Sequence, residues 1–221
     1  VLGKDVITVF GQGCGGNING FPLRSTHERA EEAGHRLGEA ALKAIRKSEA
    51  IKAQTFRVKS AREELPSAPL PGRELLAEMM DLEKDNPGRM KQLHRIQDLL
   101  KRGEKPPARR FDAHAVMFGR EWCLTTMPHE MFCQYELWID EQAPFKRTMT
   151  FAFTNGYQGY IAVDQALTLG AKGGYEAGRL PNWGGQVYTK HLGPPAVGAE
   201  KIIKDTLASL WPRDPENSLK E

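Results

Sequence analysis

Cysteine is scarce in this chain of 221 residues, and the few cysteines form no recognisable site. Cys14, Cys123 and Cys133 are an odd number without a Cys-x-x-Cys pair, so the sequence predicts neither a disulfide framework nor a thiolate zinc site. Long apolar runs are also lacking, since none approaches the roughly 18 residues that a membrane-spanning helix needs. We therefore expect no transmembrane segment.

A strong excess of charge of either sign is absent as well. The chain has 31 basic and 28 acidic side chains, a formal net charge of +3, which argues against nucleic acid or an anionic membrane surface as the partner. The composition, 40% apolar and 27% charged, is typical of a globular domain that can bury a substantial core. The basic residues between 89 and 102 are expected to form a solvated face.

Three common catalytic signatures are missing: the Gly-x-Ser-x-Gly elbow, the His-Glu-x-x-His metal motif and a Ser/His/Asp order. Five histidines show no metal-ligand spacing and are expected at the surface or in packing roles: His27, His35, His94, His114 and His191. Any metal site must therefore depend on other residues of this chain, or on residues outside it.

The spacing of apolar residues predicts an α/β fold. The run Val6–Phe10 is typical of a buried strand, and Ser25 and Glu28 are spaced as a capping box for the helix that follows. Further strands are expected at 55–59, 113–118, 122–126 and 148–154, a surface connection at 64–72, and helices within 73–103 and at 128–141, 164–169 and 199–211. Because a buried strand normally has neighbours on both sides, we expect a preceding segment or a second chain beside residues 6–10.

A glycine-rich loop follows the first expected strand and contains Gly11-x-Gly13-x-x-Gly16, which matches the dinucleotide-binding fingerprint. That motif requires a helix to begin within it, so that the helix N-terminus meets the pyrophosphate, but here the expected helix begins some ten residues later. The position of the helix therefore argues against nucleotide binding by this loop. The small residues of the loop would still let its backbone N–H groups approach a ligand closely.

Two further segments carry candidate functional residues. Pro128-His129-Glu130 lies between an expected strand and helix, where Glu130 either complements the helix dipole or serves as a metal ligand or general base. His129 is expected at the surface or behind the ligands rather than as a ligand itself. The segments Asn155–Tyr160 and Gly173–Glu176 are dense in glycine and tyrosine, which favours either packing or a backbone folded tightly around a ligand.

In this order, these pieces resemble the neutral/alkaline (non-lysosomal) ceramidase family. Phe10–Asn19 is similar to the family's "QGCAGDINP" or "GDVSPN" stretch, and Ala30–Leu42 to its "AExxGxRLGxAAL" helix. Met127–Glu130 resembles the strand–"PGE"–helix element, Asn155–Ile161 the "NxYxGYI" element, and Tyr175-Glu176 a "YE" element. The resemblance implies that residues 1–221 are the C-terminal part of one catalytic domain, with 52–109 as a poorly matched, helical insertion-like segment.

The family's enzymes are zinc amidases that cleave the N-acyl bond of ceramide, so the resemblance implies a zinc-dependent hydrolase with a small-molecule or lipid-like substrate. It assigns Glu130 and Tyr160 as metal ligands, Tyr160 also as a catalytic group, and Tyr157 as the less favoured choice for that tyrosine. Tyr157 and Tyr175 are assigned to substrate binding. The implied fold has mixed β-sheets packed together with helices on the outside, and the implied location is secreted or periplasmic.

The glycine loop adds further residues by the same resemblance: Gly13, Gly16 and Asn17 as substrate-binding groups, and Asn19 at the position of the family's catalytic serine. Asparagine has no hydroxyl group that could be activated. The substitution therefore argues against hydrolysis of ceramide by this chain, even if the fold is that of the family. The family's two histidine ligands match nothing here, so they are expected outside this chain, in a preceding segment or a second chain. The alternative function is a non-catalytic ceramidase-like subunit for binding or assembly.

Overall fold

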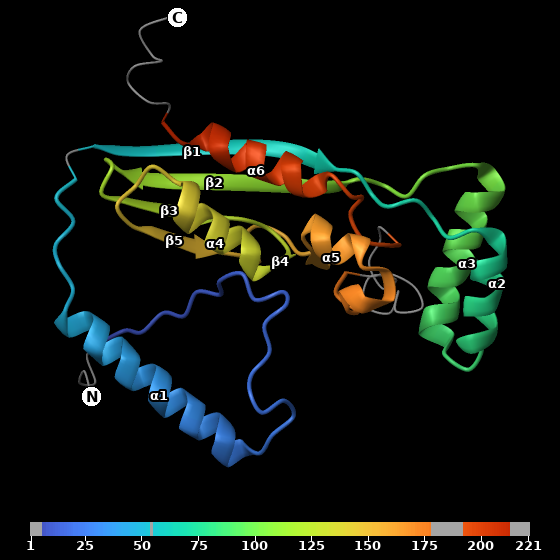
Figure 1. Ribbon diagram of the computed structural model, residues 1–221, viewed down its shortest axis with the longest axis horizontal. Coiled ribbons are helices and arrows are strands. Elements are labelled where there is room, and N and C mark those ends of the chain that lie inside the picture. The colour runs from blue at the N-terminus through green and yellow to red at the C-terminus, as the bar shows by residue number, and fades with distance from the viewer. Residues whose placement is uncertain (1–5, 54, 178–191, 213–221) are drawn as a thin grey trace, which may run out of the picture.

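The computed structural model describes residues 6–53, 55–177 and 192–212, and it shows an α/β fold built on a mixed sheet (Figure 1). The sheet has four strands in the order β1-β2-β3-β5, in which β1–β2 and β2–β3 are antiparallel and β3–β5 is parallel. The strands are β1 (Phe56–Leu65), β2 (Arg109–Phe118), β3 (Trp122–Thr126) and β5 (Thr148–Phe151). Two short parallel strands, β4 (Glu130–Met131) and β6 (Tyr160–Ile161), pair beside it.

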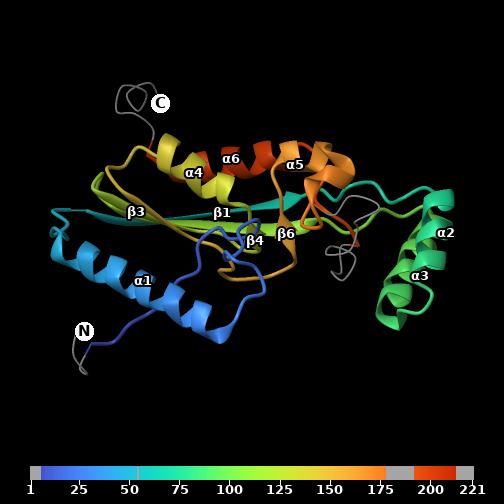
Figure 2. The same ribbon diagram turned by 60° about the horizontal axis from the view of Figure 1, so that its bottom comes forward.

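Three helices cover one face of the sheet: α4 (Cys133–Gln142), α5 (Asp164–Thr168) and α6 (Ala199–Leu210) (Figures 1 and 2). Strand β2 alternates strictly, so that every second side chain from Arg109 onward is buried beneath these helices. Helix α6 supplies Ile203, Leu207 and Leu210 to the same core. A half-buried antiparallel sheet gives this alternation, from which the sequence predicts β3 with the observed bounds, whereas β2 begins four residues before the expected position 113.

The segment expected to be a helical insertion, 52–109, contains strand β1 of the main sheet as well as a helical hairpin of α2 (Arg73–Leu82) and α3 (Pro87–Arg102). The hairpin projects from one end of the sheet and has a small core of its own, which includes Leu192 (Figure 1). Asn86 caps α3 by accepting a hydrogen bond from the Arg89 N–H at 3.1 Å, and Gly103 ends it in the left-handed conformation. The prediction of helices within 73–103 is therefore confirmed.

The first part of the chain differs from the sequence-based predictions. Residues 6–10 form no regular strand, because none of the described strands pairs with them, and their apolar side chains are exposed. Helix α1 (His27–Arg46) follows as expected, but its N-cap is Thr26, which accepts from the Arg29 N–H, so the predicted Ser25–Glu28 capping box is wrong. No residue of α1 is buried.

The helix predicted to open at Pro128 begins instead at Cys133. Residues 130 and 131 first form β4, because their backbone pairs with Tyr160 and Ile161. Strand β1 continues to the buried Leu65, so the surface connection expected at 64–72 begins after that residue. Strand β5 ends at Phe151, three residues before the expected end at 154. Within the described ranges, no helix is both long and apolar enough to cross a membrane.

Candidate functional site

The candidate site is built where β4 and β6 pair in parallel register, with Glu130 directly opposite Tyr160. The Glu130 N–H donates to the Gly159 carbonyl at 3.2 Å, and the Phe132 N–H donates to the Ile161 carbonyl at 3.2 Å. Side chains at opposed positions of neighbouring strands project to the same face. The register therefore places a carboxylate beside a phenol, two residues that lie 30 positions apart in the sequence.

Two more tyrosines complete this cluster. The Tyr157 hydroxyl donates to Glu130 Oε2 at 3.3 Å, and the hydroxyls of Tyr160 and Tyr175 lie 3.4 Å apart. The rings of Tyr160 and Tyr175 meet edge to face, with 5.7 Å between their centroids. Tyr157 and Tyr175 are about half-exposed, so the cluster opens to the surface. The structure thus brings together Glu130 and all three tyrosines named by the ceramidase resemblance.

The electrostatics of this cluster favour its protonated forms. Burial raises the pKa of Glu130, hydrogen bonds from Tyr157 and Tyr160 oppose that shift, and the charge of Glu176 adds to it. Burial also raises the pKa of Tyr157 and of Tyr160, in both cases with a contribution from the negative charge of Glu130. Tyr157 and Tyr160 are therefore neutral hydrogen-bond donors, and burial favours the protonated form of Glu130.

The backbone around the cluster is held in conformations that are unfavourable for residues other than glycine. His129, Phe153 and Asn155 have φ angles of 70°, 56° and 62°, in the left-handed region. The His129 N–H donates to the Gly156 carbonyl at 2.9 Å, and its carbonyl accepts from the Phe153 N–H at 3.0 Å. Strained residues of this kind gather at functional sites, where surrounding contacts hold them in place.

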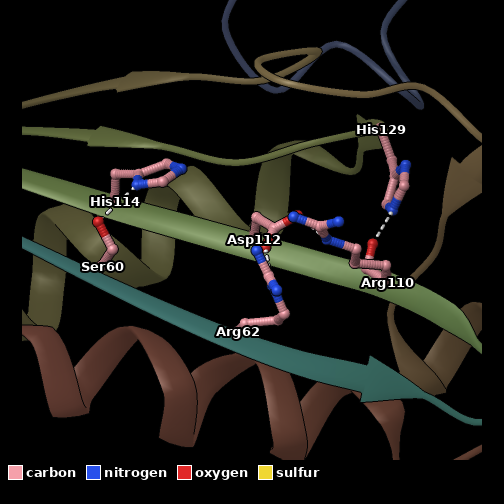
Figure 3. Close-up of polar contacts among 6 residues, drawn as sticks. All are labelled: Ser60, Arg62, Arg110, Asp112, His114 and His129. Carbon is pink, nitrogen blue, oxygen red and sulfur yellow. Dashed lines mark hydrogen bonds and ion pairs between the residues drawn. The ribbon is translucent and has the colours of Figure 1, made fainter.

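His129 is buried, with 1% of its surface exposed, so a surface position for it is wrong. Its Nε2 lies 2.9 Å from the carbonyl oxygen of Arg110 on β2 (Figure 3). This contact ties the residue before Glu130 to the main sheet. His129 therefore links the backbone just before Glu130 to β2.

Arg109, a positioning residue that the sequence reasoning missed, is fully buried at the start of β2. Its Nε donates to the Gln158 carbonyl at 3.4 Å, and its Nη2 donates to the Gly193 carbonyl. Burial lowers its pKa to about 10, which leaves it charged at neutral pH. The alternation of the strand could have indicated this burial, because Arg109 lies two residues before Phe111 and four before Ala113, on the same buried face.

The glycine-rich loop lies directly behind Glu130. The Gly16 N–H donates to the Met131 carbonyl at 2.8 Å, and a Cβ on Gly16 would come within 2.6 Å of the Glu130 carbonyl oxygen. Asn17 Oδ1 accepts from the Cys133 N–H at 2.8 Å, so this side chain binds the first turn of α4. These contacts hold β4 and α4 in place, and substrate binding by Gly16 and Asn17 stays a prediction.

Two other residues of the loop have different surroundings. Gly13 packs against Glu136, whose carboxylate accepts from the Cys14 N–H at 3.0 Å. Asn19, which the resemblance aligns with a serine, is exposed. Substrate contact by Gly13 and catalysis by Asn19 stay predictions.

The donor set fits half of a zinc site. Zinc takes four ligands in structural sites and three plus water in catalytic sites. Glu130 and Tyr160 offer two oxygen donors, and no group of three or more His, Cys, Asp or Glu lies together in the described part of the chain. Further ligands would have to come from outside these residues, as the resemblance implies.

No family model matches this sequence, and neither the curated proteins nor the solved structures give a significant match. The likeness to neutral ceramidases therefore rests on the motifs of this chain and stays a prediction.

Proposed function

We propose that this chain contributes Glu130 and Tyr160 to a zinc centre that hydrolyses an amide (N-acyl) or related bond. The observation that supports it most is the parallel register of Glu130 and Tyr160, with Tyr157 and Tyr175 hydrogen-bonded around them. Four residues named by their motifs alone thereby meet in one cluster, although they come from three separate segments. The remaining ligands would come from a preceding segment or a second chain.

Zinc, when bound, would lower the pKa of a bound water toward about 7 and polarise the scissile carbonyl. The Glu130 carboxylate would hold the metal, and the Tyr157 hydroxyl, which donates to its Oε2, would fix the orientation of that carboxylate. The Tyr160 hydroxyl would donate to the oxygen that gains negative charge as water adds to the carbonyl carbon. Tyr175 would orient Tyr160 through their contact at 3.4 Å.

Hydrolysis can be tested with N-acylated lipid amides on the complete native protein and on two variants. Tyr160→Phe is expected to lower kcat/KM by about 100-fold or more, the cost of losing one oxyanion donor. Tyr175→Phe keeps Tyr160 and is expected to lower it less. Equal activity in wild type and Tyr160→Phe would contradict the proposal.

A non-catalytic binding or assembly subunit is the second candidate. The observation that favours it is that Glu130 has hydrogen-bond partners without a metal ion, since it accepts from Tyr157 and Tyr160. The raised pKa of Glu130 also favours its neutral form, which binds metal ions poorly. Asn19, in place of a serine, points the same way. This candidate predicts a native protein with neither zinc nor hydrolytic activity and with unchanged stability in chelator.

A further inference from the structure

Strand β1 forms one edge of the main sheet (Figure 1). It pairs with β2 over ten consecutive positions, Phe56–Leu65, without a bulge, and it contains neither proline nor glycine. Natural proteins usually protect an edge strand by shortening it, bulging it or placing proline in it, because its unpaired N–H and C=O groups can bind another strand. Strand β1 has none of these three protections.

The outward backbone groups of β1 have no partner in the part of the chain that the structure describes. There, the backbone hydrogen bonds of residues 56–65 all belong to the ladder with β2. From Pro66 onward the chain has a partner again, since the Ala68 N–H donates to the Pro194 carbonyl at 2.9 Å. The free edge therefore ends just before Pro66.

The opposite edge of the sheet offers much less. Strand β5 has only four residues, and the Ala152 N–H, directly after it, already donates to the Gln12 carbonyl at 2.9 Å. The glycine-rich loop thus occupies the end of that edge. Of the two edges, β1 is the one with a long row of backbone groups.

The charged side chains of β1 are divided by sign between its two halves: Arg57 and Lys59 come first, and Glu63 and Glu64 follow. All four are exposed, and none forms an ion pair among the described residues. Arg62 also lies in the second half, but its Nε donates to Asp112 Oδ1 at 2.7 Å, which balances its charge. Such a strand attracts a copy of itself that runs in the opposite direction and repels one that runs in the same direction.

We propose that β1 binds β1 of a second copy of this chain in antiparallel orientation, which joins the two main sheets into one continuous sheet. A two-fold axis perpendicular to the sheet keeps each side chain on its own face, so it passes through a residue and not between two residues. With the axis at Ser60, residues 56–64 of the two copies pair throughout. Arg57 of each copy then lies opposite Glu63 of the other, which gives two ion pairs.

The next register along the strand fits less well. An axis at Ala61 would bring Pro66 into the pair, and proline has no backbone N–H to donate. It would also place Arg57 opposite the buried Leu65. The charge order and the end of the free edge therefore both select an axis at Ser60.

The contact has the extent of a specific interface. An antiparallel pair exchanges two hydrogen bonds at every second position, so pairing over 56–64 forms about nine backbone hydrogen bonds. A typical protein–protein interface has about 10. Phe56 is 63% exposed and Val58 is 54% exposed, and the long side chains at 64 and 62 of the other copy would lie across them. An unrelated strand could supply the hydrogen bonds, but β1 itself also supplies the matching charges.

Cross-linking at the axis tests this interface in the complete native protein. The two Ser60 Cβ atoms would lie about 5 Å apart, close enough for a disulfide in Ser60→Cys. Oxidation by air with copper phenanthroline is expected to give a covalent dimer on non-reducing electrophoresis. Arg62→Cys is the matched control, because its two copies would lie about 13 Å apart along the strands and should not cross-link. Wild type under the same oxidation measures any contribution of the native cysteines, which are buried or half-buried.

Charge exchange tests the register. Glu63→Arg would place like charges opposite each other twice, and it is expected to raise the dissociation constant of the dimer at least about 10-fold in analytical ultracentrifugation. Adding Arg57→Glu to that variant restores opposite charges in reversed order, so the dissociation constant should return to within about 3-fold of wild type. Lys59→Glu changes a side chain that lies opposite Ala61 of the other copy, and its effect should be much smaller than that of Glu63→Arg.

A protein that is monomeric at every concentration would overturn the inference. So would a dimer without the Ser60→Cys cross-link, because its copies would meet through another surface, and so would a dimer that Glu63→Arg leaves unchanged. A different protein bound along β1 would be found as a complex of unequal subunits and would overturn it as well. None of these readouts depends on zinc or on hydrolysis, so the result is independent of the proposed function.

Discussion

Glu130 and Tyr160 face each other across two parallel strands of two residues each, and the Glu130 N–H closes the pair on the Gly159 carbonyl at 3.2 Å. So short a pair cannot hold its own geometry. The surrounding contacts from Gly16, His129 and Arg109 maintain it. Each of these contacts can be removed separately, and the consequences differ.

Gly16→Ala is expected to displace Glu130. The added Cβ would meet the Glu130 carbonyl oxygen at 2.6 Å and the Met131 carbonyl oxygen at 2.9 Å, and both belong to backbone that cannot easily move. We expect a loss of about 2 kcal/mol in the free energy of unfolding, measured by urea denaturation. Gly20→Ala is the matched control, because its Cβ would meet no atom within 4 Å. Equal stability of the two variants would contradict the described close approach.

Arg109→Met is expected to destabilise the site by removing a buried donor. The Gln158 and Gly193 carbonyls would lose the guanidinium that binds them. Loss of such a buried group costs about 3 kcal/mol, measurable in urea denaturation. Arg110→Met, on an exposed side chain of the same strand, should cost much less. If both variants lose the same free energy of unfolding, the burial of Arg109 does not explain its contribution to stability.

Tyr157→Phe removes the hydroxyl that donates to Glu130 Oε2. That hydrogen bond favours the carboxylate, so its loss should raise the pKa of Glu130 further and weaken zinc binding. Groups that orient a metal ligand are commonly worth about 10-fold or more in affinity. Competition with a chromophoric chelator measures the change, and Tyr175→Phe, which leaves the donor to Glu130 in place, should have a smaller effect. Unchanged affinity in Tyr157→Phe would argue against Glu130 as a ligand.

Glu130 also makes stability depend on pH in the metal-free protein. Because its pKa is raised on folding, the folded state binds the proton more tightly than the unfolded state does. The resulting stability is present below the unfolded pKa and is lost as pH rises through the folded pKa. In chelator, the melting temperature of wild type relative to Glu130→Gln should therefore fall as pH rises from 4 upward. A difference that is flat or rising would contradict the raised pKa.

The proximity of Glu130, Tyr160 and Tyr175 was predictable from the sequence, whereas their local structure was only partly so, and their roles in a site stay predictions. The motifs around Glu130, Tyr160 and Tyr175 pointed to one cluster, and the strand–helix alternation after residue 108 predicted β2, β3 and β5 of the main sheet. The β4–β6 pair was missed because two-residue strands carry no periodicity, and the helix was therefore expected to begin at Pro128. The family motif has glycine at the position of His129, and the φ of 70° found there is one that glycine adopts readily.

Other features depend on contacts that are distant in the sequence. Arg109 is buried because its partners are carbonyl groups at 158 and 193, far along the chain. Residues 6–10 have the composition of a strand, but a strand also needs a paired neighbour, and among the described residues none is placed beside them. The local sequence pattern indicates a strand-like composition, but it does not indicate whether a neighbouring strand is present to pair with.

The zinc content of the complete native protein tests the central claim most directly. Elemental analysis should find about one zinc per chain in the wild type, much less in Glu130→Gln, and an unchanged amount in Glu63→Gln, an exposed glutamate on β1. The zinc content of Tyr160→Phe should lie between that of the wild type and that of Glu130→Gln. No zinc in the wild type, or equal zinc in wild type and Glu130→Gln, would contradict a metal centre at Glu130 and Tyr160.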